Sequence, residues 1–340
     1  MTNQSNVKFE PDKHLCFEKP DLVYTWADLG FHGDISVSSF CAADPFPLFS
    51  ADAISEMRKE ALQVHVLSDY SYSDDNTAMS MRGYAAAHAP FTSAAWKHPR
   101  TLQILSEIAG VELAVKLELE LGHVNFGAKS PQKLASIQAP DETLPYTYES
   151  DDTSIKSDDL GKTLGWHKDS YPFSCTLMLS NTKRVTGGQI VMALADGRLQ
   201  KLRQCETGSV VFIQGRHLFH TALRSEGPEV RMTMVCPMWP ASPFVQDDTF
   251  LTYTRTISDT SYIEYRFNML IERLRSHQEQ NREVRDRGAK LVTKELKGFI
   301  HDQITFLSQM QNEIVEEDKI EAWGFKPGVP HPDAVFSIKP

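Results

Sequence analysis

The sequence predicts a mainly β core with flanking α-helices, and three observations carry this prediction. Four short strand-like runs, SCTLMLS, GGQIVMAL, GSVVFIQG and VRMTMVCPMW, lie between residues 164 and 239 and are separated by turn sequences such as NTKRVTGG and SEGPE. Apolar residues at helical spacing precede them, and a long charged helical pattern follows them. A chain of 340 residues exceeds one ordinary core, so we expect one elaborated domain with a helical extension.

The first part of the chain divides at Ser50. Residues 1–49 are punctuated by prolines, so we expect an irregular segment there. From Ser50 the stretch SADAISEMRKEALQVHVL has helical spacing, and Ser50 or Asp52 can cap the helix. A second helical pattern, TSAAWKHPRTLQILSEIAGVEL, contains Pro99, which should divide it into two helices, and Gly110, which should end it.

A strand pattern and a long polar segment come next. VKLELELGHVNFG alternates from Val115 to Phe126, which predicts a strand. Residues 128–162 include the acidic run YESDDTSIKSDD and have no clear periodicity, so we expect a lid or a polar insert. We place the main domain at residues 50–259, with residues 260–340 as a helical extension and tail packed on it.

The C-terminal part is predicted to be helical and charged beyond Tyr262. Tyr265, Met269, Leu270 and Leu274 should form a buried stripe, and a homodimer contact through these helices is left open. The apolar residues of the tail sequence DAVFSIKP indicate either local packing or closure over a pocket.

Composition limits the function classes. The net charge of −10 argues against nucleic acid or an anionic membrane as the main partner. Five scattered cysteines without C-x-x-C spacing indicate reduced thiols, and neither a signal-peptide core nor an 18-residue apolar run is present in this sequence. We therefore expect a cytoplasmic protein that acts on a small molecule.

The stretch LGWHKDSYPFSCTLMLS holds two good metal ligands, His167 and Asp169. Residues two apart on a strand point to the same face, so this imidazole and this carboxylate can share one metal ion. A second histidine would complete the ligand set of two His and one carboxylate, which is typical of non-haem Fe(II) oxygenases. His217 and His220 in QGRHLFH are the candidates, and only one of them should point inward because they are three apart.

The run VRMTMV adds an anion anchor. Arg231 and Thr233 share a face at i and i+2, and a guanidinium beside a hydroxyl can hold a carboxylate. In GHVNFG, His123 and Asn125 also share a face, so Asn125 is either a donor to the same ligand or part of an ordinary strand end.

This ordered set resembles the Fe(II)/2-oxoglutarate-dependent dioxygenase superfamily, which carries H-x-D, a distal His, and then an Arg followed by Ser or Thr two positions later. His220 follows Asp169 by 51 residues and Arg231 follows His220 by 11, which fits the family better than His217 does. GGQIVMALADG and ETGSVVFIQGRHLFH resemble the segments that join these elements in the family. The match spans residues 164–239, and the helices before it are similar to those of fungal small-molecule members.

The resemblance implies a double-stranded β-helix, the cupin-like jelly roll, with the metal in the barrel mouth. It implies Fe(II) held by His167, Asp169 and His220, 2-oxoglutarate as cosubstrate held by Arg231 and Thr233, and O2 as oxidant. The implied reaction is oxidation of an unactivated C–H bond by hydroxylation, desaturation or cyclisation. An amino acid or amino-acid-derived intermediate of fungal secondary metabolism is the favoured substrate.

Three alternatives remain open from the sequence. The first is a protein hydroxylase of the prolyl type. The second is a non-catalytic cupin-like protein that binds a metal or a small acid. The third is a zinc hydrolase on the same scaffold.

Overall fold

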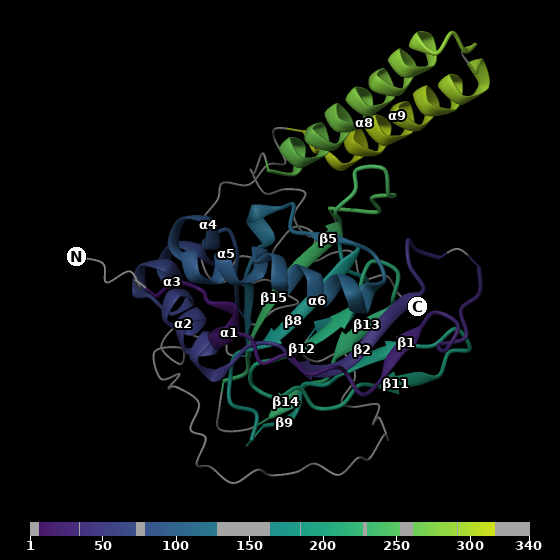
Figure 1. The fold of residues 1–340 in the computed structure, drawn as a ribbon. Helices are drawn as coiled ribbons and strands as arrows, with labels where there is room; N and C mark the ends of the chain where they lie inside the picture. The colour runs from purple at the N-terminus through teal and green to yellow at the C-terminus, as the bar shows by residue number, and fades with distance from the viewer. Residues whose placement is uncertain are drawn as a thin grey trace.

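The structure is a computed structural model, and it describes residues 7–33, 35–72, 79–127, 164–183, 185–226, 230–251, 261–290 and 292–316. Within these residues, two antiparallel sheets form a barrel, helices cover the outer face of the larger sheet, and a helical hairpin extends beyond it (Figure 1). The predicted insert at residues 128–162 and the tail sequence DAVFSIKP lie outside the described residues.

The larger sheet has nine strands in the order β1-β2-β12-β8-β15-β6-β4-β3, and β5 pairs with β15. Their bounds are β1 Val23–Thr25, β2 Phe40–Pro47, β3 Ser71–Tyr72, β4 Met79–Met81, β5 Leu113–Ala114, β6 His123–Phe126, β8 Phe173–Met178, β12 Ser209–Ile213 and β15 Met232–Pro240.

The smaller sheet has four strands in the order β11-β10-β13-β7, and a separate pair joins β14 to β9. Their bounds are β7 Leu164–His167, β9 Thr186–Gly187, β10 Ile190–Ala193, β11 Leu199–Lys201, β13 His220–Ala222 and β14 Ser225–Glu226.

The chain crosses repeatedly between the two sheets. If β6, β7, β8, β10, β11, β12, β13 and β15 are counted as strands 1 to 8, the larger sheet contains the order 6-3-8-1 and the smaller sheet has the order 5-4-7-2. This interleaving of eight antiparallel strands is the jelly roll. The predicted fold class, a double-stranded β-helix with flanking helices, is confirmed.

The helices before the barrel strands pack on the larger sheet. Their bounds are α1 Pro11–His14, α2 Ala51–Ala61, α3 Val64–Tyr70, α4 Ala85–His88, α5 Pro90–Lys97 and α6 Pro99–Ala109, with a 3-10 turn η1 at Glu118–Glu120. Ser50 caps α2 by accepting from the Ala53 backbone N–H at 3.3 Å, as predicted. Pro99 starts α6 and Gly110 ends it with φ +68°, also as predicted. The helix predicted from Ser50 runs as two helices because Gln63 is extended.

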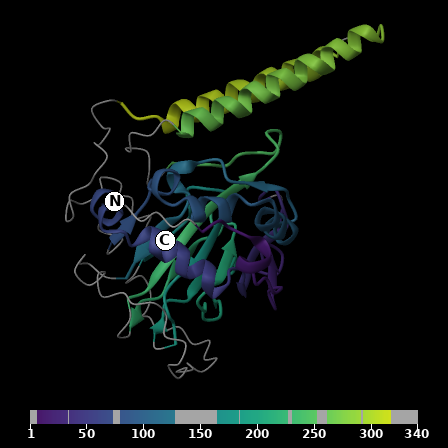
Figure 2. The ribbon, with the colours of Figure 1, turned by 60° about the vertical axis from the view of Figure 1, so that its left-hand side comes forward.

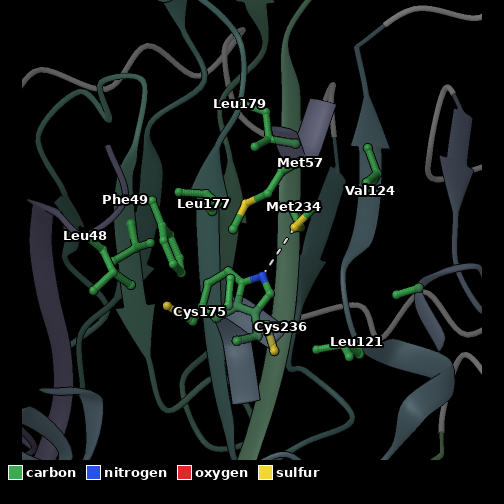
Figure 3. Packing of buried hydrophobic residues seen from close by; sticks show 14 of the residues in the cluster. Leu48, Phe49, Met57, Leu121, Val124, Cys175, Leu177, Leu179, Met234 and Cys236 are labelled. Atoms are coloured by element: carbon green, nitrogen blue, oxygen red, sulfur yellow. Dashed lines mark hydrogen bonds between the residues drawn. The ribbon is translucent and has the colours of Figure 1, made fainter. Parts of the chain in front are cut away.

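The main hydrophobic core lies between these helices and the larger sheet. Along β8 and β15 side chains alternate, so that Cys175, Leu177, Met234 and Cys236 point to the helices and are fully buried. Figure 3 shows these four packed with Met57 of α2. The intervening residues of both strands therefore point into the barrel.

Two sequence predictions are wrong. Residues 40–47 are not irregular but form β2, which pairs with β12. Every residue of β2 except Pro47 is buried, so it shows no alternation, and Pro45 is tolerated at a bulge in the ladder opposite Val211. The strand predicted from Val115 to Phe126 forms only at His123–Phe126, because the preceding stretch turns as η1.

The C-terminal stretch forms an antiparallel hairpin of α8 Ser261–Asp286 and α9 Thr293–Glu313, which extends past the barrel (Figure 2). Its base packs on the barrel through Tyr265 against Trp239 and through Glu313, which accepts from the Leu251 N–H at 2.7 Å. The predicted packing on the barrel thus holds only at the base. Of the predicted buried stripe, Tyr265 is buried, whereas Leu274 is 48% exposed. No helix within the described residues is long and apolar enough to cross a membrane.

Candidate metal centre

Three side chains from the two halves of the predicted motif meet at the barrel mouth. His167 ends β7 and stands opposite His220, the first residue of β13, in the ladder of the smaller sheet. Asp169 follows β7, and its Oδ1 lies 3.5 Å from His167 Nε2 and 3.6 Å from His220 Nε2. One ligand atom from each of the three lies within 4.8 Å of the others, so a single ion could contact all three.

Both imidazoles are oriented by main-chain carbonyls. His167 Nδ1 donates to Gly165 O at 2.8 Å, and His220 Nδ1 donates to Leu218 O at 2.9 Å. The Nε2 atoms of both rings therefore face the carboxylate. Burial lowers the pKa of His220 to about 4, which keeps this ring neutral, the form that binds a metal.

The third group, Asp169, is held in place by main chain. Its N–H donates to Gly215 O at 2.9 Å, and a Cβ added to Gly215 would stand 1.8 Å from Asp169 Oδ2. Burial alone would raise the pKa of Asp169, but the His220 and His167 rings and a hydrogen bond from the Ser174 hydroxyl hold it well below its usual range. The site thus presents two imidazole nitrogens and one ionised carboxylate.

A cavity inside the barrel holds the predicted anion anchor. It lies between the two sheets, and its volume is about 10 Å³. Its lining includes Arg231 and Thr233 from the strand that carries the predicted pair, Thr176 and Met178 of β8, and Gly188 beside β10. Ser174, Thr176 and Met178 alternate on the inner side of β8, so this strand leads from Asp169 to Arg231.

The Arg231 guanidinium is poorly satisfied. Its Nη2 donates to Gly188 O at 3.2 Å, and its buried Nε has no hydrogen-bond partner within the described part of the chain. No carboxylate among the described residues pairs with it, and burial lowers its pKa. A half-buried cation whose buried Nε donor has no partner among the described residues is a receptor for an anion. Gly188 is required beside it, because an added Cβ would stand 2.9 Å from Arg231 Nε.

Other predicted residues lie elsewhere. His217 pairs with Asp248, with Nε2 and Oδ2 2.8 Å apart, and does not join the cluster. Asn125 stands opposite Thr233 in the ladder, and its Oδ1 accepts from the Ser80 hydroxyl at 2.7 Å. Asn125 therefore lies in the same cross-strand row as Thr233, and its contact with a ligand stays a prediction.

The sequence did not identify the glycines that shape the site. Gly215 stands in GSVVFIQG just before the distal histidine, and Gly188 stands in GGQIVMAL. Both segments belong to the predicted motif, but the close approach of Gly215 to Asp169 and of Gly188 to Arg231 joins residues that are far apart in the sequence. Ser174 was also missed, because its role depends on the turn that brings Asp169 back over β8.

Comparison with known proteins adds little. No protein-family model matches the chain, and no curated protein matches it. Solved structures with similarity include AviO1 from Streptomyces viridochromogenes Tue57, at 14% identity and a TM-score of 0.37 over 61% of this chain and 93% of that one. The alpha ketoglutarate dependent epimerase SnoN from nogalamycin biosynthesis matches at 13% identity and a TM-score of 0.36, over 57% and 75% of the two chains.

A 2OG-Fe(II) oxygenase family oxidoreductase from Burkholderia pseudomallei matches at 14% identity and a TM-score of 0.31, over 54% of this chain and 76% of that one. Similarity at this level carries no argument about function. The chemistry must be argued from the side chains described above.

Proposed function

We propose that the chain is a non-haem Fe(II)/2-oxoglutarate-dependent oxygenase that oxidises an unactivated C–H bond of a small molecule. The observation that carries the proposal is the pairing of two features in one barrel. His167, Asp169 and His220 offer the ligand set of a facial triad, and Arg231 offers an uncompensated guanidinium along the same inner wall.

The residues fit the metal and the cosubstrate. Two imidazoles and an ionised carboxylate suit Fe(II) and leave coordination positions open for other ligands. When bound with 2-oxoglutarate, Fe(II) would supply the activation of O2. Arg231 would bind the far carboxylate of the cosubstrate by charge-assisted hydrogen bonds, with Thr233 beside it, while the keto acid end faces the triad.

The chain's own contribution is positioning. The ladder pairing of His167 with His220 and the contact of Asp169 with Gly215 fix the ligands, and Arg231 would set the distance of the cosubstrate from them. Such placement matters, because a displacement of about 1 Å can cost roughly 10²-fold in rate. An amino acid or amino-acid-derived natural-product intermediate is the proposed substrate, and hydroxylation, desaturation and cyclisation are all compatible with this site.

The uncompensated Arg231 favours turnover with a keto acid over simple metal storage, since a protein that only binds a metal has no use for an unpaired cation inside the barrel. Anaerobic Fe(II) with 2-oxoglutarate should give a weak visible charge-transfer band, and admission of O2 should release succinate. The His220→Ala protein should lose both signals, and His217→Ala, which changes the neighbouring histidine, should keep them. Hydrolysis that needs neither O2 nor 2-oxoglutarate would instead assign the site to a zinc hydrolase.

A screen of free amino acids and related metabolites for stimulated succinate release would then identify the substrate class. Stimulation by a proline-containing peptide but by no free metabolite would favour the protein hydroxylase.

A further inference from the structure

The α8–α9 hairpin carries a group of exposed apolar side chains far from the proposed active site. Six of them, which we call the apolar face, are between 41% and 57% exposed: Phe267, Ile271 and Leu274 on α8, and Ile300, Ile304 and Leu307 on α9. Single exposed apolar residues are ordinary, but a contiguous group on a folded chain marks a contact surface.

The contact line between the two helices shows where these residues point. His277 stacks on Phe299 with ring centroids 4.0 Å apart, and the Arg273 guanidinium lies 4.4 Å from the centre of the Phe306 ring. These pairs fix which residues of α8 and α9 face each other and which lie at the same level along the hairpin. By this register Ile271 of α8 lies close to the level of Ile304 of α9.

The apolar residues lie on one side of this contact line. Leu274 follows Arg273 by one position, and Leu307 follows Phe306 by one position. One position is a rotation of about 100° in a helix. In two antiparallel helices that face each other, the same rotation away from the contact line brings the apolar residues of α8 and those of α9 to the same side of the hairpin. The six residues therefore form one continuous face.

The barrel lies on the other side of the hairpin. Tyr265 packs on Trp239, and Gln309 donates to Thr249 O at 3.2 Å. In sequence Gln309 comes three positions after Phe306, which is a rotation of about 60° in the sense opposite to that of the apolar face. The apolar face thus points away from the barrel, and a second molecule could approach it without meeting the barrel.

We propose that the apolar face docks on the same face of a second copy of the chain and forms an antiparallel four-helix bundle that joins two barrels. The spacing of the apolar residues supports a two-fold arrangement. On both helices they are spaced by four and then three positions, with Ile271 and Ile304 in the middle. A two-fold axis that lies in the contact plane, perpendicular to the helices and near Ile271 and Ile304, places α8 against α8 and α9 against α9 of the partner copy. It pairs Phe267 with Leu274 of the partner copy.

The contact area is sufficient for a dimer. The proposed axis passes close to the middle of α9, whose 21 residues span about 30 Å, and two packed helices are roughly 20 Å wide. The covered face is therefore on the order of 600 Å² per copy, which approaches the roughly 800 Å² per partner of a standard interface. Two-helix hairpins commonly complete their burial by pairing into four-helix bundles.

Sedimentation of the full chain tests the proposal. The wild-type protein at micromolar concentration should have twice the 38.4 kDa mass of one chain. The double variant Ile271→Glu/Ile304→Glu, which places carboxylates at the axis, should sediment as a single chain with an unchanged circular dichroism spectrum. The matched control Asn268→Glu/Thr305→Glu changes exposed residues of the same helices off the apolar face and should remain dimeric.

Cross-linking gives an independent readout. In a Cys16→Ser background, which removes the exposed native thiol, Ile304→Cys should be linked into a dimer by a short bis-maleimide, whereas Thr305→Cys should not. A monomeric wild-type protein, or a double variant that remains dimeric, would overturn the proposal. A wild-type monomer that begins to self-associate when residues 317–340 are removed would assign the face to the chain's own tail instead.

Discussion

Two arginines of this barrel, Arg82, which is buried, and Arg231, which is half-buried, differ in what surrounds them. Arg82, just after β4, pairs with Glu120 at 2.7 Å and lies over the Tyr72 ring at 4.9 Å. Arg231 has one carbonyl partner and no acid among the described residues. Burial alone would lower the pKa of Arg82, but Glu120 raises it, whereas burial lowers the pKa of Arg231. A compensated guanidinium stabilises the fold, and an uncompensated one is available for a ligand.

The largest expected effect is on the free energy of unfolding, at Arg82, whose charge is compensated by Glu120. Arg82→Leu leaves the Glu120 carboxylate buried without its partner, so the free energy of unfolding should fall by about 3–5 kcal/mol. Urea denaturation measures it. The matched change Arg231→Leu removes a half-buried charge that has no acid partner in the described structure, so it should cost less than about 1 kcal/mol. Equal losses in the two variants would remove the distinction between these arginines.

The pH dependence of stability sharpens the same contrast. Burial alone would raise the pKa of Glu120, but the Arg82 guanidinium, helped by His123 and Tyr171, lowers it from 4.5 to about 2. A carboxylate with a lowered folded pKa stabilises the protein above its unfolded pKa and loses that contribution as the pH falls through the folded value. The contribution is about 3 kcal/mol.

The wild-type chain should therefore exceed Glu120→Gln in unfolding free energy most above pH 4.5. The gap should narrow as the pH approaches 2, and urea titrations at several pH values measure it. A gap that is independent of pH would show that Glu120 acts through packing alone.

The sequence predicted one of these arginines and missed the other. Arg231 was found because it follows His220 at a recognisable spacing and stands two before Thr233. Arg82 and Glu120 were not found, because a buried ion pair between residues 38 positions apart leaves no periodic signal. Glu120 even lies in an alternating run that predicts a strand, although its inward turn as part of η1 satisfies Arg82.

The same difference holds for the fold: elements with local sequence signals were predictable, and features that depend on distant contacts were not. Short strands bounded by turn residues, the helix capped by Ser50 and the helix that starts at Pro99 were predictable, because their signals are local. β2 was not, because a strand buried on both faces has no alternation. In the candidate site the three ligand positions and Arg231 come from the motif, whereas Gly215, Gly188 and Ser174 depend on contacts between distant segments.

At Arg231, which has no acid partner among the described residues, the expected effect is on binding of the cosubstrate 2-oxoglutarate. Under the proposed function, Arg231→Leu should raise the KM for 2-oxoglutarate on the order of 10²-fold, because about two charge-assisted hydrogen bonds are lost. Arg231→Lys should recover only part of this, since lysine keeps the charge but cannot bind a carboxylate bidentately. Initial rates of succinate release measure both. A KM unchanged in Arg231→Leu would mean that the cosubstrate carboxylate binds elsewhere.

The smallest effect should come from a single methyl group at the metal end. Gly215→Ala places a Cβ where it would stand 1.8 Å from Asp169 Oδ2, so the carboxylate must move and Fe(II) affinity should fall roughly 10–100-fold. Gly165→Ala is the matched control, because no atom lies within 4 Å of its added Cβ, although Gly165 also lies beside a candidate ligand, His167. Anaerobic titration with Fe(II) compares the two. If both variants bind like the wild type, Asp169 does not need its observed position, and the assignment of this carboxylate as a metal ligand would be wrong.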